Sequence, residues 1–345
     1  MSSVLQRMKH ASVVFHRQRR DEMFSPGPGA NAGGLYFPFK RLRERFAQVG
    51  VQLATPDMNV GKAVAFELHF NARRRVPKVP CYAYLWEHPL IRPVNADLRC
   101  LARYRGAFTW NEEIVDGQHI HLLPIPNDLT PQEVPSFAER DLFCVLIAGN
   151  RALRKRNPLG LTEKRLEAIR WFDQHAPEHF ALYGHGWERP AQAPGIGGRL
   201  TKRLYEWRAR WWPREGFRTY RGPIPSKDDV LKRAKFSICY ENVRGGTGYV
   251  TEKIFDAMIY GCLPVYIGAS DVARRVPPEC YLDGDRFQDP AALFAALQAI
   301  EEDEFQFRRQ RTLEFLRSER ALPYGNEHFC STIVDTISAD LGLKP

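Results

Sequence analysis

The chain has 345 residues, enough for two domains that each bury a core of their own. Hydrophobic residues make up 44% and charged residues 26% of it, a balance that excludes a disordered polar chain. The formal net charge of +10 predicts an anionic partner, and nucleic acid, an acidic membrane and a nucleotide-charged substrate all fit it.

Cysteine usage and hydropathy both favour a cytoplasmic protein. The seven cysteines are widely spaced and form no CxxC pair, so we expect buried, reduced thiols. No stretch approaches the roughly 20 apolar residues that cross a bilayer. The basic N-terminal segment has too short an apolar run for a signal peptide.

The first part of the chain alternates strand and helix patterns, which predicts one α/β domain. Residues 35–49 carry apolar side chains at helical spacing and end at Gly50, so a helix is expected there. Residues 25–34 form a glycine- and proline-rich loop before it. Short apolar runs predict strands at 11–15, 51–54, 63–68, 82–86, 106–110 and 121–123.

A polar, proline-containing segment at 127–140 marks the expected domain boundary. We therefore predict one domain at 1–135, a second at 136–325, and a C-terminal helix at 326–345 that packs back on the first domain. In the second domain we expect strands at 142–148, 180–183, 236–240 and 263–267, and helices at 162–175, 226–234, 291–300, 305–316 and 328–341.

The stretch 236–268 organises this second domain and reads as a strand, a glycine-rich loop, a helix and another strand. Thr251 is the expected N-cap of the helix, and Gly261 is expected to end it. Such a unit places helix N-terminal amides at the carboxyl edge of a parallel sheet, where nucleotide phosphates bind. Lys253 in the first helical turn opposes the helix dipole, which indicates an anionic ligand.

The residues YENVRGGTGYVTEKIFDAMIYGCLPVYIG in this stretch closely resemble the signature of the α-1,3/α-1,4-fucosyltransferase family. Weaker similarity covers KRLEAIRWFDQHAPEHFALYGHGW and GASDVARRVPPECYLD in the second half, and YLWEHPLIRP and AFTWNEEIVD in the first. The resemblance implies an α/β protein of GT-B architecture, with two Rossmann-like domains facing a central cleft. The first domain would bind the acceptor and the second the GDP-sugar donor.

The resemblance also implies roles for single residues of the donor domain. Glu252 matches the family glutamate that holds the donor ribose, and Lys253 matches the lysine on the pyrophosphate. Tyr249 matches the aromatic residue near the guanine, and Asn242 the asparagine beside it. Arg165 aligns best with the family's phosphate arginine, whose charge would stabilise the leaving diphosphate.

Ordinary structural roles stay open for these donor residues. Glu252 would complement a helix dipole, Tyr249 would pack in a core, and Asn242 would cap a turn. Arg165 would lie on a solvated basic face. Four neighbouring basic residues compete with it for the same phosphate: Arg151, Arg154, Lys155 and Arg156.

The catalytic base has to come from elsewhere in the chain. Glu87 directly follows the strand expected at 82–86 and is the candidate general base that takes a proton from the acceptor hydroxyl. Glu112 and Glu113 follow another aromatic strand end and stay open as alternatives. A helix cap or a salt bridge would also account for any of the three.

No metal cofactor is expected. The sequence Asp283-Gly284-Asp285 has the Asp-x-Asp form of metal-dependent transferases, but its glycine and position favour a tight turn. His119 and His121 have no carboxylate or cysteine partner at ligand spacing. Fixed cationic groups would replace the metal ion in the reaction.

We therefore expect an inverting fucosyltransferase that moves L-fucose from GDP-fucose to a glycan hydroxyl. The acceptor would be an oligosaccharide or lipid-linked glycan, joined through an N-acetylglucosamine or glucose unit in α-1,3/1,4 linkage, and no nucleic-acid partner is expected. A GT-B transferase for another nucleotide sugar remains an alternative. A catalytically silent glycan- or nucleic-acid-binding protein remains a second alternative, since basic residues together with aromatic residues are typical of such proteins.

The segment between Arg199 and Arg221 interleaves basic residues with tryptophans. This composition fits docking on an anionic membrane surface, which would make the cytoplasmic protein peripheral to the inner face of a membrane. The alternative is an insertion that packs its tryptophans on the domain while its arginines stay solvated.

Overall fold

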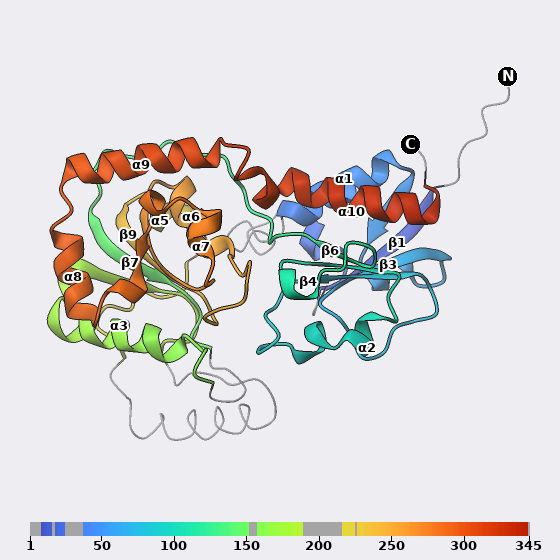
Figure 1. The fold of residues 1–345 in the computed structure, drawn as a ribbon, viewed down its shortest axis with the longest axis horizontal. Coiled ribbons are helices and arrows are strands. Elements are labelled where there is room, and N and C mark those ends of the chain that lie inside the picture. The colour runs from blue at the N-terminus through green and yellow to red at the C-terminus, as the bar shows by residue number, and fades with distance from the viewer. Residues whose placement is uncertain are drawn as a thin grey trace. The chain divides into compact units, whose positions relative to one another are not determined.

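The computed structural model describes residues 8–15, 18–24, 37–151, 157–188, 216–224 and 226–343 (Figure 1). The loop predicted at 25–34, residues 152–156 with Arg154, Lys155 and Arg156, and most of the segment between Arg199 and Arg221 lie outside this description. The chain divides into two compact units. The first comprises Met1–Asp128, Thr247–Tyr249 and Leu322–Pro345, and the second comprises Leu129–Gly246 and Val250–Ala321.

The first unit is built on a parallel sheet, whose described strands run in the order β2-β1-β3-β4-β5-β6. The strands are β1 (Lys9–Val14), β2 (Val51–Ala54), β3 (Val64–Phe70), β4 (Cys81–Leu85), β5 (Gly106–Thr109) and β6 (Ile120–Leu122). All residues of β4 are buried, which explains why its sequence is apolar throughout and does not alternate. Functional side chains of such a sheet are expected in the loops at the carboxyl ends of its strands.

Two long helices complete the core of the first unit, α1 (Phe37–Gln48) and α10 (Asn326–Leu341). Helix α1 buries Phe39, Leu42 and Phe46, and α10 buries Phe329 and Ile333, so each presents an apolar stripe at helical spacing. The two stripes belong to one hydrophobic cluster, and the helices lie side by side in Figure 1. Shorter helical turns of this unit are α2 (Leu98–Leu101), η1 (Glu22–Phe24), η3 (Pro56–Asn59), η4 (Pro93–Ala96), η5 (Glu112–Ile114) and η9 (Leu322–Tyr324).

The second unit has its own parallel sheet, in the order β11-β10-β9-β7-β8 over the described strands. These are β7 (Leu142–Ile147), β8 (Phe180–Tyr183), β9 (Ala234–Tyr240), β10 (Leu263–Ile267) and β11 (Leu282–Asp283). The helices are α3 (Thr162–His175), α5 (Asp228–Leu231), α6 (Glu252–Ile259), α7 (Val272–Arg275), α8 (Pro290–Gln298) and α9 (Glu302–Leu316), with short turns η6 (Pro177–His179), η7 (Pro278–Cys280) and η8 (Gly284–Arg286).

Most predicted elements are present, and the differences lie at their ends. The helix predicted at 226–234 is only the four-residue α5, because the chain joins β9 already at Ala234. The N-terminal stretch of the first unit runs to Asp128, and Leu322–Pro345 rejoin that unit. Among the helices that the structure describes, none is both long and apolar enough to cross a bilayer.

Candidate active site

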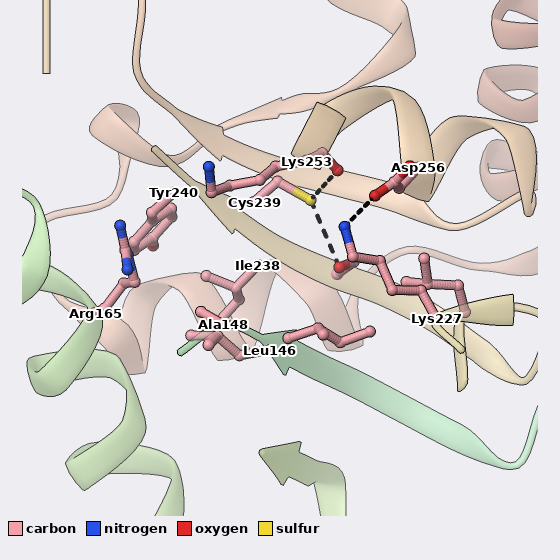
Figure 2. Close-up of a pocket in the computed structure, with 12 residues that line it drawn as sticks. Leu146, Ala148, Arg165, Lys227, Ile238, Cys239, Tyr240, Lys253 and Asp256 are labelled. Carbon is pink, nitrogen blue, oxygen red and sulfur yellow. Dashed lines mark hydrogen bonds and ion pairs between the residues drawn. The ribbon is translucent and has the colours of Figure 1, made fainter. Parts of the chain in front are cut away.

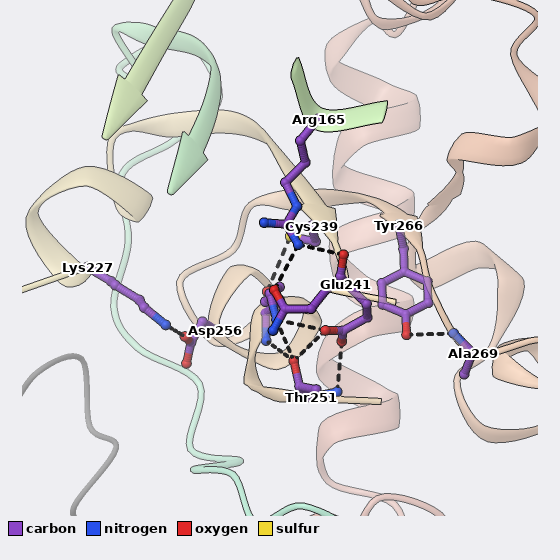
Figure 3. Close-up of polar contacts among 10 residues, drawn as sticks. Arg165, Lys227, Cys239, Glu241, Thr251, Asp256, Tyr266 and Ala269 are labelled. Carbon is purple, nitrogen blue, oxygen red and sulfur yellow. Dashed lines mark hydrogen bonds and ion pairs between the residues drawn. The ribbon is translucent and has the colours of Figure 1, made fainter. Parts of the chain in front are cut away.

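The glycine-rich loop between β9 and α6 is organised around a buried carboxylate. Glu241 directly follows β9 and is 0% exposed. It accepts hydrogen bonds from the amide and the hydroxyl of Thr251, both at 2.9 Å, and from Lys253 Nζ at 2.7 Å (Figure 3). Thr251 is the N-cap of α6, as predicted. Glu241 therefore holds the start of α6 at the carboxyl edge of the sheet.

Lys253 finds its counter-charge inside the protein. Burial lowers the pKa of its ammonium, but the carboxylates of Glu241 and Glu252 raise it more, so that the pKa lies above its ordinary value. Glu241 thus supplies a negative charge beside Lys253, whose place in the first helical turn indicates an anionic ligand. Within the described chain, Nζ also donates to Thr251 Oγ1 at 3.1 Å, which leaves its third N–H available to a ligand.

Arg165 extends from α3 to the same strand end. Its side chain is buried, with 4% of the residue exposed, so it does not lie on a solvated basic face. One terminal nitrogen, Nη2, donates to the backbone carbonyl of Glu241 at 2.7 Å and to Asn242 Oδ1 at 2.8 Å. Arg165, Asn242 and Lys253, three of the five predicted donor residues, are therefore brought together around Glu241.

Glu252 lies in the first turn of α6 and is half-buried. Burial raises the pKa of its carboxyl, but the positive charges of Lys253 and Lys227 lower it more, and the pKa lies below its ordinary value. The group is therefore a carboxylate at neutral pH. A carboxylate has acceptor capacity for the two hydroxyls of a ribose, the role that the family resemblance implies.

A second, half-buried ion pair joins Lys227 to Asp256 beside this site (Figure 2). Both residues line a cavity of about 20 Å³ at the end of β9, together with Arg165 and Lys253. A cavity of this size has room for about one water molecule among these charged side chains. Positive and negative side chains alternate through this network, which fixes the orientation of each.

Sequence reasoning gave no role to Glu241, Lys227 or Asp256. A signal for Glu241 was present, since a carboxylate that directly follows a buried strand and precedes a glycine-rich loop is poised at the functional edge of the sheet. Lys227 carried no such signal. It reads as an ordinary loop lysine until the fold places Asp256 against it.

Tyr249 belongs to a different environment from the other predicted donor residues. It is grouped with the first unit, whereas Arg165, Asn242 and Lys253 belong to the second. Its ring is buried and lies 5.1 Å from the ring of His88 and 4.7 Å from that of Trp110, measured between centroids. Aromatic packing of this kind is the core role that the sequence left open for Tyr249.

Glu87 lies just beyond the carboxyl end of β4, in a loop whose backbone is fixed. Its amide donates to Asn71 Oδ1, and its carbonyl accepts from Asn95 Nδ2, both at 2.7 Å. The next residue, His88, is buried and stacks on Trp110 at 5.6 Å. Rigid backbone at a strand end suits a group that must meet a substrate in one position.

The alternative carboxylates lie at the end of the neighbouring strand. Glu112 and Glu113 form the turn η5 after β5, which pairs with β4 in parallel. The amide of Glu113 donates to Asn111 Oδ1, so Asn111 caps this turn. The structure therefore brings all three candidate bases to one edge of the first sheet.

The Asp-x-Asp sequence forms the predicted turn. Asp283 accepts a hydrogen bond from the amide of Asp285 at 3.0 Å, and Asp285 pairs with Arg244 through two contacts of 2.5 and 2.6 Å. These carboxylates are engaged in holding a loop of the protein. His119 contacts the backbone carbonyl of Tyr104 at 2.9 Å.

Two parallel-sheet α/β units, one with a charged strand-loop-helix site, form the GT-B fold. The chain superposes on a solved α1,3-fucosyltransferase with GDP at a TM-score of 0.50 and 14% identity, over 97% of this chain and 92% of that one. It superposes on an α-glucosyltransferase in complex with UDP-glucose and DNA at a TM-score of 0.52 and 9% identity, over 96% and 99%. The predicted α/β fold class, with two parallel-sheet domains, is confirmed.

Within that class, residues 215–331 match the model of glycosyltransferase family 10 (fucosyltransferase), C-terminal part. A segment of 66 residues is 36% identical to α-(1,3)-fucosyltransferase FucT of Helicobacter pylori, covering 19% of this chain and 14% of that protein. A segment of 74 residues is 39% identical to α-(1,4)-fucosyltransferase of Arabidopsis thaliana, covering 21% and 18%. The resemblance to the α-1,3/α-1,4-fucosyltransferase family is confirmed in this part of the chain, and the matches span less than a fifth of either relative.

Proposed function

We propose that the protein is an inverting fucosyltransferase that transfers L-fucose from GDP-fucose to a hydroxyl of a glycan acceptor. The observation that carries the proposal is the loop between β9 and α6, which Glu241 holds in place through Thr251 and Lys253. This loop lies in the segment that matches the family 10 model. It sets a lysine and the start of a helix at one strand edge, and a helix N-terminus in such a place favours phosphate binding.

In the proposed reaction the acceptor oxygen attacks the anomeric carbon of fucose while Glu87 takes its proton. The bond from that carbon to GDP breaks as the new glycosidic bond forms on the opposite face, so the configuration inverts. The electron pair moves to the β-phosphate oxygen of GDP. Lys253 and Arg165 stabilise the charge that grows there, and their preorganised positions make this effective.

The proposed acceptor is an oligosaccharide or lipid-linked glycan with an N-acetylglucosamine or glucose unit, joined in α-1,3/1,4 linkage. Support comes from the names of the relatives, which are α-(1,3)- and α-(1,4)-fucosyltransferases. The proposed reaction uses no metal cofactor, because fixed cations of the protein act on the leaving group.

A GDP-release assay tests the proposal. GDP-fucose is offered with a panel of N-acetyllactosamine and O-antigen-like oligosaccharides, and thermal shifts are compared for GDP-fucose, GDP-mannose and UDP-glucose. We expect stabilisation by GDP-fucose and release of GDP that depends on one acceptor class. Turnover of another donor would support a GT-B transferase for that sugar, and binding without any turnover would support a silent glycan-binding protein.

We further propose that the basic and aromatic segment between Arg199 and Arg221 docks on an anionic membrane, at its cytoplasmic face. Its composition supports this, because arginines and lysines are attracted to anionic lipid while tryptophans partition into the interface. Co-sedimentation with vesicles tests the proposal, with anionic lipid at low salt, the same at high salt, and neutral lipid as control. An absence of binding at low salt would contradict it.

A further inference from the structure

Three side chains with metal-binding chemistry gather on one face of the first sheet. Glu67 and His69 are two residues apart on β3, so their side chains point to the same side of the strand. Cys81 begins β4 and pairs in register with Glu67. One carboxylate oxygen, one ring nitrogen and the sulfur all lie within 4.8 Å of one another.

The surroundings of His69 orient its ring. Nε2 contacts Glu67 Oε2 at 2.7 Å, and Nδ1 contacts the hydroxyl of Tyr104 at 3.0 Å. Tyr104 is itself held, because its hydroxyl accepts a hydrogen bond from the amide of Arg73 at 2.9 Å. A second-shell partner on the distal nitrogen is typical of histidines that bind metal. The simpler alternative is a hydrogen-bonded core histidine with no ion.

The donor atoms and charge of this cluster suit a cation held by three protein ligands. Ligand atoms around zinc lie roughly 3.3 to 3.6 Å apart, given metal–ligand bonds of about 2.0 to 2.3 Å. Glu67 Oε2 and His69 Nε2, now 2.7 Å apart, would separate to that spacing, and the 20% exposed side chain of Glu67 has room to move. A thiolate and a carboxylate would neutralise a divalent ion, as a buried site requires. Sulfur and imidazole ligands select zinc over magnesium or calcium.

We propose that Glu67, His69 and Cys81 bind a zinc-like divalent cation that links β3 to β4, with Tyr104 positioning the imidazole. The ion takes the place of the proton on the Cys81 thiol. It would enter from the side of Glu67, because that side chain is partly exposed. Cys81 is at the amino end of β4 and Glu87 is beyond its carboxyl end. Six residues of extended chain separate them by roughly 20 Å. The cation therefore stabilises the first unit and takes no part in sugar transfer.

Cobalt(II) is the probe for this site, because a thiolate bound to cobalt absorbs in the near ultraviolet. Full-length protein is treated with a chelator, desalted and titrated with Co²⁺. We expect one equivalent to produce the thiolate band, and Cys81→Ser to abolish it. Cys100→Ser is the matched control, since Cys100 is also buried in the first unit and its thiol donates to the carbonyl of Arg73 at 3.0 Å. This variant should keep the band.

Zinc affinity gives a second measurement, which does not depend on the cysteine variant folding. Competition with a chromophoric chelator should show at least tenfold weaker zinc binding in Glu67→Gln, a change at a partly exposed position. GDP release should be the same with and without zinc, which separates this site from the proposed transfer reaction. Three outcomes would each overturn the proposal: no thiolate band in the unsubstituted protein, a thiolate band that persists in Cys81→Ser, or unchanged zinc affinity in Glu67→Gln.

Discussion

Lys253 Nζ lies 2.7 Å from a carboxylate oxygen of Glu241, and this carboxylate has no exposed surface. The pair connects the end of β9 to the first turn of α6 across the glycine-rich loop. Taking one charge away leaves the other buried without compensation, which is more costly than the pair is stabilising. The shape of the proposed donor site therefore depends on a residue that need not touch the donor.

Replacing Glu241 by glutamine should destabilise the protein by about 3 kcal/mol, because the Lys253 ammonium loses the carboxylate to which it is hydrogen-bonded. Urea unfolding measures the change. Glu314→Gln is the control, since Glu314 forms an exposed pair with Arg311 at 2.6 Å, and its loss should cost less than about 1 kcal/mol. Equal effects of the two variants would contradict the role given to Glu241. The double variant Glu241→Gln/Lys253→Met should recover part of the loss, since both charges are then gone.

Glu87→Gln should separate binding from chemistry. We expect GDP-fucose to bind as in the unsubstituted protein while transfer falls by about 10²- to 10⁴-fold, the usual contribution of a general base. Binding is measured by thermal shift and transfer by GDP release. Glu112→Gln and Glu113→Gln are the controls, because both lie at the neighbouring strand end. If Glu87→Gln kept full turnover and one of the two control variants lost it, the residue replaced in that control would be the general base.

Gly268→Ala should disturb the donor site by steric overlap. A Cβ at this position would lie 2.3 Å from Tyr266 Oη and 2.5 Å from Glu241 Cγ. Both side chains are held, since Tyr266 accepts a hydrogen bond from the amide of Ala269 at 3.1 Å and Glu241 is fixed by Lys253 (Figure 3). We expect a loss of about 1 to 3 kcal/mol in unfolding free energy, with weaker GDP binding.

Gly216→Ala is the matched control for this substitution. A Cβ at Gly216 would meet no atom of the described residues within 4 Å, and the residue belongs to the same unit. Its stability should stay within about 0.5 kcal/mol of the unsubstituted protein. If Gly268→Ala behaved in the same way, the loop would be more adaptable than its contacts indicate.

His88 should make the first unit sensitive to acid. Burial lowers the pKa of its imidazole from 6.5 to about 4. Between these values the unfolded chain binds the proton and the folded chain does not, so stability is lost as the pH falls from about 6.5 towards 4. At pH 5 this difference corresponds to about 2 kcal/mol relative to pH 7.

The variant His88→Asn removes this titration and keeps an acceptor for the amide of Leu90, which donates to His88 Nδ1 at 3.1 Å. The drop in unfolding free energy from pH 7 to pH 5 should be about 2 kcal/mol smaller in the variant. From pH 7 to pH 8 the two proteins should change in parallel, because the histidine is neutral throughout. An equal drop towards pH 5 would show that His88 is protonated in the folded protein.

Local sequence patterns predicted most of the secondary structure. Helix α3 and strands β2, β8 and β10 begin and end where apolar periodicity places them. Helix α5 is shorter than predicted, because strand β9 already begins at Ala234, where it pairs with its partner strands. Pairing with a distant strand is a tertiary effect, which a local pattern does not record.

The sequence by itself determined the strand-loop-helix unit at 236–268, since its glycines, its N-cap and its apolar stripe act over short distances. It also determined the family resemblance and the residues that this resemblance marks. Only the tertiary structure decided what those residues contact. Glu241 became the anchor of the loop, Arg165 reached it from α3, and Tyr249 packed with the first unit. Which charges and aromatic rings interact depends on which of them the fold brings close together, even when they are far apart in the chain. Their burial then determines how strong each interaction is.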